Sequence, residues 1–203
     1  MKPATEKRQS GIALVGELPW GTHFCQFYKT KKDLTDMLVP YFKAGLENNE
    51  KCVLVTSDFL TEEDAKKVLK RSIRGFSNYL EKGQMEIFPY KEWYLKGGNF
   101  DLRRTLNMWM EKHEQALYDG FAGLRVSGNP YWIDNKKDWD DFTDYEAEIN
   151  KVIGGTKLLV LCTYSLKKCG VSEILDVVKN HEFTLAMNQG VWQIVNMPAL
   201  EKS

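Results

Sequence analysis

Cysteine is scarce in this chain of 203 residues. Four cysteines lie at positions 25, 52, 162 and 169. They show neither the C-x-x-C spacing of redox and zinc motifs nor the density of a small disulfide-stabilised scaffold. We therefore expect free thiols and no structural disulfide.

Long apolar runs are absent as well. The chain has no run of roughly 18 or more apolar residues, and its first ten residues, MKPATEKRQS, lack the hydrophobic segment of a signal peptide. We expect a cytoplasmic protein that does not interact with a membrane. Residues 1–10 show no apolar periodicity and predict a flexible lead-in, whereas 11–203 predict a single folded domain.

The chain has no excess of charge of either sign. Lysine and arginine together number 28, aspartate and glutamate together also number 28, and 43% of the residues are hydrophobic. This composition excludes a disordered polyelectrolyte and provides no general attraction to nucleic acid. We expect a small molecule or another protein as the partner, without direct contact to DNA or RNA.

Two common catalytic motifs are also missing. No G-x-S-x-G nucleophile elbow occurs, so a hydrolase has no support. Gly154-Gly155-Thr156-Lys157 resembles a phosphate loop only superficially, because it precedes a predicted strand, whereas such a loop must follow one to direct backbone N–H groups at phosphate. We expect this segment to be a turn.

Short apolar segments alternate with amphipathic ones along the chain. Strands are predicted at 22–28, 51–57, 84–90, 123–128 and 157–164, and helices at 33–46, from 61, at 99–118, 139–153 and 171–180. Continuous apolar strands that alternate with helices indicate an α/β fold with a mostly parallel central sheet and helices on both faces. Residues 183–187 and 190–195 predict a C-terminal antiparallel hairpin at the edge of that sheet.

Ligands of such sheets bind beyond the carboxyl ends of the strands. The residues predicted there are rich in aromatic rings and thiols, and we take eight of them as candidate ligand-binding residues: His23, Cys25, Tyr28, Trp93, Arg125, Trp132, Cys162 and Tyr164. His23 and Arg125 would supply polar anchors. This wall suits a small apolar or weakly polar ligand, although each residue could equally be an ordinary core residue at a strand end.

A metal site is an alternative interpretation of some of these residues. His23 and Cys25 are two positions apart and would share one face of a strand, and Cys162 and His181 could complete four ligands. A hydrogen-bonded buried histidine beside a core thiol is the simpler interpretation, so we predict neither a metal nor a cofactor. Glu146 lies among several acidic residues, and we expect it on a solvated helix face.

Several segments in order resemble one known family. They are His23-x-Cys25-x-Phe27-Tyr28, residues 41–46, residues 52–55, Tyr94-x-x-Gly97-x-x-Phe100, residues 120–125, Tyr145-Glu146, Leu161-Cys162-x-Tyr164 and His181. This series resembles the MEDS family, the methanogen and methylotroph, DcmR-type sensory domains, over about residues 11 to 195. The resemblance implies a relative of RecA and KaiC-type ATPases that senses hydrocarbon derivatives such as halomethanes or methylated compounds.

The ATPase relationship implies a phosphate loop between the first strand and the next helix. Residues 28–33 occupy that place and contain no glycine, so we expect a non-enzymatic sensor. Lys29, Lys31 and Lys32 could still meet an anion, which leaves a degenerate nucleotide-binding protein as one alternative and a thiol or metal redox sensor as another. No output segment is recognisable after residue 195, so we expect signalling through a regulatory protein partner, a kinase or a transcription factor, or through a homo-oligomer.

Overall fold

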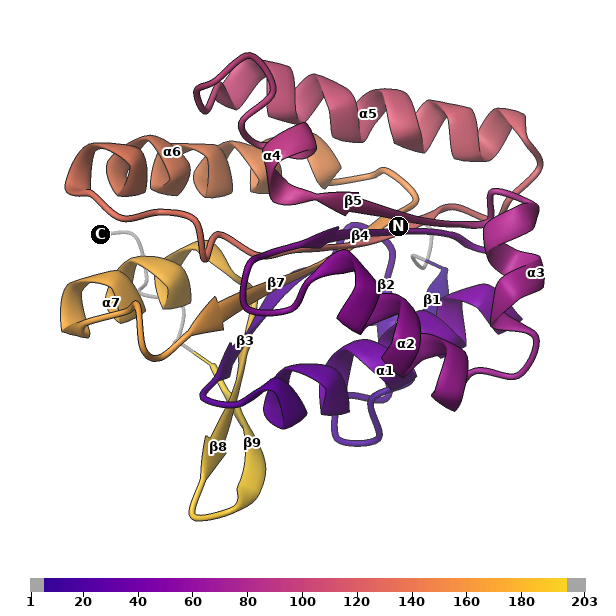
Figure 1. Ribbon diagram of the computed structural model, residues 1–203, viewed down its shortest axis with the longest axis horizontal. Helices are drawn as coiled ribbons and strands as arrows, with labels where there is room; N and C mark the ends of the chain where they lie inside the picture. The colour runs from indigo at the N-terminus through magenta and orange to yellow at the C-terminus, as the bar shows by residue number, and fades with distance from the viewer. Residues whose placement is uncertain (1–5, 197–203) are drawn as a thin grey trace, which may run out of the picture.

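A seven-stranded sheet forms the centre of the molecule. The computed structural model describes residues 6–196, and its main sheet has the strand order β5-β4-β6-β7-β3-β8-β9 (Figure 1). The strands are β3 (His23–Tyr28), β4 (Lys51–Thr56), β5 (Met85–Pro89), β6 (Leu124–Gly128), β7 (Leu158–Ser165), β8 (Thr184–Asn188) and β9 (Val191–Val195). Neighbouring strands pair in parallel except for β8 and β9.

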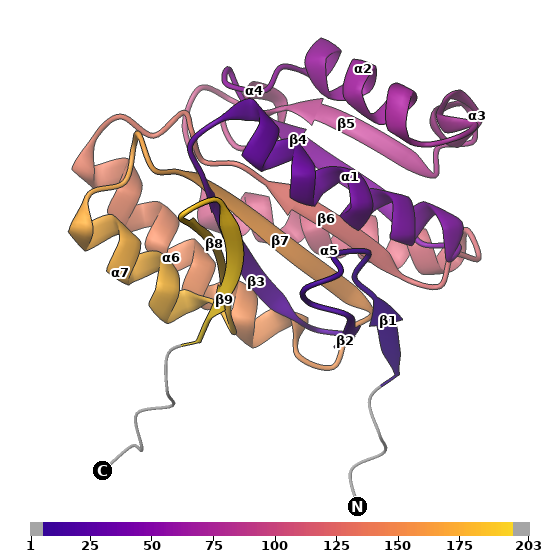
Figure 2. The same ribbon diagram turned by 90° about the horizontal axis from the view of Figure 1, so that it is seen from below.

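Helices cover both faces of this sheet (Figure 2). One face packs against α1 (Lys31–Glu47), α2 (Glu62–Ser72) and α3 (Phe76–Glu81). The other face packs against α4 (Tyr90–Trp93), α5 (Leu102–Tyr118), α6 (Lys136–Ile153) and α7 (Val171–Asn180). The predicted α/β architecture, with a mostly parallel sheet between two helical layers, is confirmed.

Successive strand residues alternate between two hydrophobic cores. In β3, Phe24 joins the core under α1, whereas Cys25 and Phe27 join the core under α6 and α7. Cys25 pairs with Cys162 across β3 and β7, which lie side by side at the middle of the sheet. This register directs His23 and Cys162 toward the same layer of helices.

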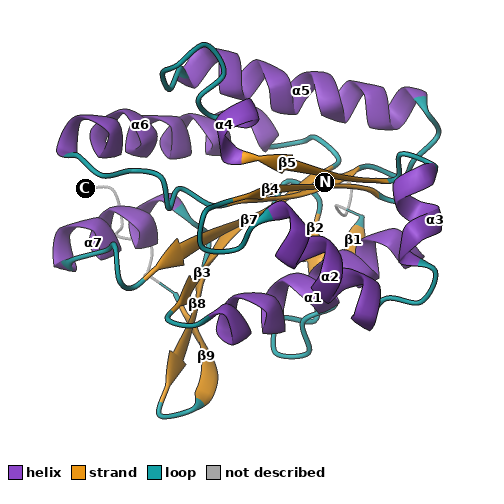
Figure 3. Cartoon of the chain, viewed as in Figure 1, coloured by secondary structure: helices purple, strands orange, loops and turns teal. Residues whose placement is uncertain are grey.

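The predicted C-terminal hairpin is also confirmed, with one refinement. β8 runs parallel to β3 because α7 carries the chain back across the sheet from β7, and only β9 is antiparallel (Figure 3). The hairpin turns at Gln189, whose φ of 50° lies in the left-handed region, and at Gly190.

Part of the predicted lead-in belongs to the folded domain. Residues 1–5 lie outside the described part of the chain, but Lys7–Gln9 form β1 and pair antiparallel with β2 (Glu17–Pro19). Arg8, in β1, also binds the buried carboxylate of Glu50. Among the helices formed by residues 6–196, none is long and apolar enough to cross a membrane.

Candidate functional site

A buried polar cluster lies between the sheet and its α6–α7 layer. It consists of His23 at the start of β3, Glu146 on α6, Cys162 on β7 and His181 immediately after α7. One nitrogen, oxygen or sulfur atom of each residue lies within 4.8 Å of those of the other three. Four elements that are distant in sequence therefore direct metal-binding atoms to one point.

The carboxylate of Glu146 is the centre of this cluster. Its Oε2 lies 3.0 Å from Nε2 of His23 and 3.3 Å from Nε2 of His181. The Sγ of Cys162 lies 3.3 Å from Nε2 of His23 and 3.6 Å from Oε2 of Glu146. The four residues are between 0% and 7% exposed, so bulk water does not reach these groups.

Hydrogen bonds fix the orientation of both imidazole rings. Asn150 donates its amide Nδ2 to the carbonyl of Asn180 at 2.6 Å, so its Oδ1 accepts from Nδ1 of His23 at 3.0 Å. Nδ1 of His181 donates to the carbonyl of Val177 at 2.6 Å. With Nδ1 protonated, a ring in its neutral form presents the lone pair of its Nε2 to the cluster.

Burial and charge act strongly on the protonation of these groups. Burial alone would raise the pKa of Glu146, but the neighbouring His181 and His23 lower it to about 2. Burial, and then the charge of Glu146, raise the pKa of the Cys162 thiol well above its ordinary value. Burial and the neighbouring His23 lower the pKa of His181.

Two other predicted site residues lie beside this cluster. Tyr164 follows Cys162 on the same face of β7, and its ring centroid is 5.7 Å from that of His181. The buried Tyr164 hydroxyl has no hydrogen-bond partner. Cys25 shares the face but lies 3.2 Å from the Thr184 hydroxyl, a contact that either atom could donate, and the structure does not place it among the four clustered residues.

The two predicted tryptophans belong to an aromatic layer on the same side of the sheet. Trp93 packs on Trp109 with ring centroids 4.1 Å apart and is buried. Trp132 is half-buried and packs against Tyr94, Phe100 and Phe142. Of the eight candidates, Trp132 alone lines a described cleft, of about 310 Å³, together with Leu95, Phe100 and a rim that includes Asp134, Asp138 and Asp141.

Tyr28 lies elsewhere in the structure, at the carboxyl end of β3. Its ring centroid is 5.2 Å from that of Phe59, and its hydroxyl accepts a hydrogen bond of 3.0 Å from the amide of Asn129. The side chain belongs to the core under α1. Tyr28 is therefore separated by the sheet from the His23 and Cys162 cluster.

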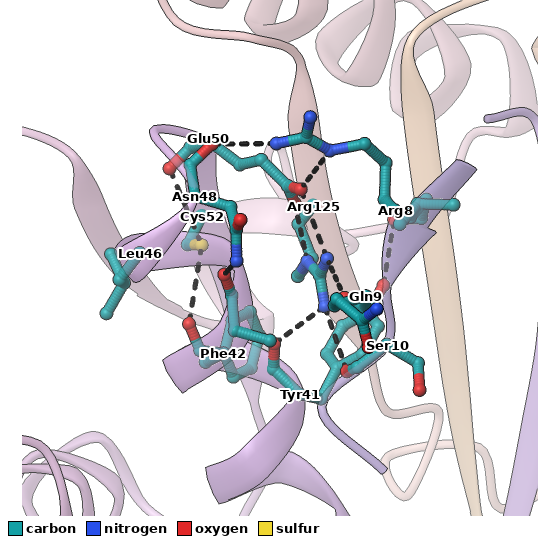
Figure 4. A network of polar contacts seen from close by, with 12 residues as sticks. Arg8, Gln9, Ser10, Tyr41, Phe42, Leu46, Asn48, Glu50, Cys52 and Arg125 are labelled. Carbon is teal, nitrogen blue, oxygen red and sulfur yellow. Dashed lines mark hydrogen bonds and ion pairs between the residues drawn. The ribbon is translucent and has the colours of Figure 1, made fainter. Parts of the chain in front are cut away.

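The N–H groups of the Arg125 guanidinium are all engaged by acceptors within the protein. Its side chain points from β6 toward α1, where its five N–H groups meet both carboxylate oxygens of Glu50, at 2.6 and 3.2 Å, and the carbonyls of Gln9, Ser10 and Tyr41 (Figure 4). Burial alone would lower the pKa of Arg125, but the charge of Glu50 raises it. The expected role of Arg125 as a ligand anchor is therefore not supported, because all of its donors are engaged.

In the connection between β3 and α1, where a phosphate loop would lie, a carboxylate of this protein occupies the backbone N–H groups. Thr30 caps α1, and the carboxylate of Asp33 accepts hydrogen bonds of 3.0 Å from the backbone N–H groups of Lys29 and Thr30. Lys31 pairs with Asp64 at 2.6 Å, and Lys32 pairs with Asp36 at 2.6 Å. The site of an anion is thus filled by a carboxylate of this chain.

Sequence reasoning missed the central residue of the cluster. Glu146 was expected on a solvated helix face, which is wrong: it is 2% exposed and lies between two histidines. The signal was present in its spacing, because Phe142, Tyr145 and Ile149 form the buried face of α6 and Glu146 lies four residues after Phe142. Asn150, four residues after Glu146 on α6, was also missed.

Comparisons with solved structures show which fold this is. A KaiC-like protein from Pyrococcus horikoshii superposes with a TM-score of 0.67 and 14% identity, covering 98% of this chain and 92% of that one. The flagellar accessory protein FlaH from Methanocaldococcus jannaschii superposes with a TM-score of 0.54 and 12% identity, covering 89% of this chain and 79% of that one. The predicted RecA and KaiC-like architecture is confirmed.

Sequence comparisons identify the family. The transcriptional repressor DcmR of Methylorubrum extorquens is 26% identical over 187 residues, which are 90% of this chain and 67% of the repressor. The model of the family described as the methanogen and methylotroph, DcmR sensory domain matches residues 22–182, a span that contains all four residues of the buried cluster. The chain belongs to the MEDS family of sensory domains.

Proposed function

We propose that this protein is a non-enzymatic sensor that binds a small, weakly polar organic molecule and signals to a regulatory protein partner. Its membership of a sensory-domain family and its similarity to a transcriptional repressor indicate a regulatory role. The chemical class of the ligand, a halomethane or a methylated compound, is our proposal. We further propose that the protein works in the cytoplasm.

The cleft beside Trp132 is the observation that supports this ligand class. Its apolar wall includes Leu95, Phe100 and Trp132. Its polar rim includes Asp134, Asp138 and Asp141, and Asp134 and Asp141 pair with Lys168 and Lys137. Aromatic rings bind methylated ammonium ions through their faces, and nearby carboxylates add charge attraction. The buried indole N–H of Trp132 has no hydrogen-bond partner among the described residues.

The closed phosphate position argues against the nucleotide-binding alternative. A nucleotide would need the backbone N–H groups that Asp33 already occupies, and its phosphates would meet that carboxylate as a like charge. Lys31 and Lys32 are already paired with aspartates. We therefore propose that ATP neither binds at this site nor is hydrolysed there.

The edge of the sheet offers a surface for the regulatory partner or for a second copy of this chain. β9 is the last strand of the sheet, and Val191, Ile194 and Val195 on it are 61%, 39% and 44% exposed. An exposed apolar edge strand can extend its sheet with a strand from another chain. We propose that the output of the sensor passes through this edge.

Isothermal titration calorimetry with four compounds tests the proposed ligand class. We expect heat of binding with trimethylamine, dichloromethane or methanethiol and none with ATP and magnesium. Trp132→Leu should weaken the binding about tenfold, because it removes an aromatic wall worth about 1.4 kcal/mol. The matched variant Trp192→Leu, in the opposite core, should leave the affinity unchanged. Binding of ATP without binding of any of the three organic compounds would refute the proposal.

A further inference from the structure

We infer that His23, Glu146, Cys162 and His181 form a binding site for one divalent transition metal ion of the zinc type. This site is separate from the cleft beside Trp132, and the inference does not depend on the ligand proposed for that cleft. It rests on the geometry of four buried side chains and on the hydrogen bonds that orient them.

The chemistry of the four side chains favours this class of metal. Two imidazole nitrogens, one sulfur and one carboxylate oxygen make a mixed set of nitrogen, sulfur and oxygen ligands. Zinc accepts all three kinds of ligand, whereas calcium and magnesium require oxygen ligands almost throughout. Two imidazoles and a thiol beside one carboxylate therefore favour zinc over calcium or magnesium here.

The distances from the Glu146 carboxylate to the other three ligand atoms are close to those around a tetrahedral ion. Bonds of about 2.1 Å to nitrogen or oxygen and about 2.3 Å to sulfur place neighbouring ligands about 3.4 to 3.7 Å apart. In the cluster, the distances from the Glu146 Oε2 to the two Nε2 atoms and to the sulfur are 3.0, 3.3 and 3.6 Å. The remaining pairs lie within 4.8 Å, so the most distant ligand atoms would approach each other by about 1 Å to accommodate the ion.

The outer hydrogen bonds have the pattern that holds histidine ligands in place. Metal-binding histidines usually donate the other ring N–H to a carbonyl or carboxylate, which fixes the tautomer and the direction of the ring. His23 is held in this way by Asn150, and His181 by the carbonyl of Val177. Both free Nε2 lone pairs then point at the centre of the cluster.

The same atoms fit poorly together without an ion. Nε2 of His181 lies 3.3 Å from the Glu146 carboxylate, yet it is buried and has no hydrogen-bond partner within residues 6–196. If both rings are neutral, two lone pairs face one carboxylate oxygen, and a buried polar atom without a partner costs about 1 to 3 kcal/mol. A bound cation supplies the positive charge that all four atoms can share.

Metal analysis of the intact protein tests the inference directly. We expect one zinc ion per chain after purification or after reconstitution with zinc. Substitution with cobalt should give a thiolate-to-cobalt charge-transfer band, which reports coordination by Cys162 sulfur. Cys162→Ser should abolish this band. The control Cys169→Ser should keep it, because Cys169 is a half-buried thiol outside the cluster.

A second variant distinguishes a metal site from a merely structural cluster. Asn150→Ala leaves all four ligands in place but removes the acceptor of the His23 ring, so zinc affinity should fall about 10- to 100-fold. His113→Gln is the matched control on α5, and it should bind zinc as the unmodified protein does. A wild-type protein that neither contains zinc, nor takes it up, nor shows the cobalt band would overturn the inference, whether or not any variant folds.

Discussion

Two buried polar clusters lie on opposite faces of the same sheet, and they differ in how completely their groups are paired. On the α1 face, each N–H group of Arg125 meets an acceptor, and the charge of Glu50 balances its own. On the α6 face, the Nε2 atoms of His23 and His181 converge on the Glu146 carboxylate. The first cluster is complete within the protein, whereas in the second the buried Nε2 of His181 has no hydrogen-bond partner among the described residues.

This difference separates a structural role from a functional one more clearly than residue type does. A buried arginine on a strand and a glutamate on a helix would ordinarily be assigned to a ligand site and to the surface respectively. The contacts reverse both assignments, because every N–H group of Arg125 meets an acceptor and Glu146 is buried between two imidazole rings. Unpaired atoms, more than burial itself, mark the place where a ligand is missing.

We expect the largest effect from disrupting the fully paired cluster around Arg125. Arg125→Met leaves Glu50 buried with Arg8 as its remaining partner among the described ion pairs, so the free energy of unfolding should fall by about 3 to 5 kcal/mol. Urea-induced unfolding followed by circular dichroism measures this change. Arg8→Met is the matched control, and it should cost about 1 kcal/mol because Arg8 is partly exposed. Equal losses in the two variants would contradict a complete, self-sufficient pairing at Arg125.

Zinc should change the free energy of unfolding by an intermediate amount. It should act only through the cluster around Glu146. An ion that binds only the folded state stabilises it by about 2.7 kcal/mol when free zinc is roughly 100-fold above its dissociation constant. We expect this gain in the Arg8→Met variant as well, because the two clusters lie on opposite faces of the sheet. Unfolding with and without zinc measures it, and Glu146→Gln should remove most of it. A gain that survives Glu146→Gln would place the zinc elsewhere.

The fold could be predicted from the sequence in most of its elements. Strand and helix ranges followed from continuous apolar runs and from caps such as Thr61, whose side chain accepts from the backbone N–H of Asp64. The short helices α3 and α4 and the strands β1 and β2 were missed, because three to six residues carry no periodicity. The parallel direction of β8 was missed since the pairing of a strand depends on where the preceding helix leads the chain.

The candidate site could be predicted only in part. The alternation of strand residues placed His23 on one face correctly, and it indeed lies 3.3 Å from Cys162. Which helix covers that face is a tertiary property, so the sequence could not indicate that Glu146 would lie between His23 and His181. The expected partner thiol, Cys25, faces Thr184 instead, because β8 pairs with β3 at that residue.

We expect the smallest effect from Asp33 at the start of α1, whose carboxylate also has its hydrogen-bond partners within the protein. Burial alone would raise the pKa of Asp33, but hydrogen bonds from the Thr30 side chain and from the backbone of Lys29 and Thr30 together hold it below its ordinary value of 3.8. Asp33→Ala should cost about 0.5 to 1 kcal/mol at neutral pH, and the control Asp36→Ala, which loses only a surface ion pair, should cost less. Because the pKa is lower in the folded state, this contribution is present above pH 3.8 and disappears as the pH falls through the folded pKa. Unfolding curves of the wild type and Asp33→Ala that converge at low pH would support a closed anion position, and a constant difference would contradict it.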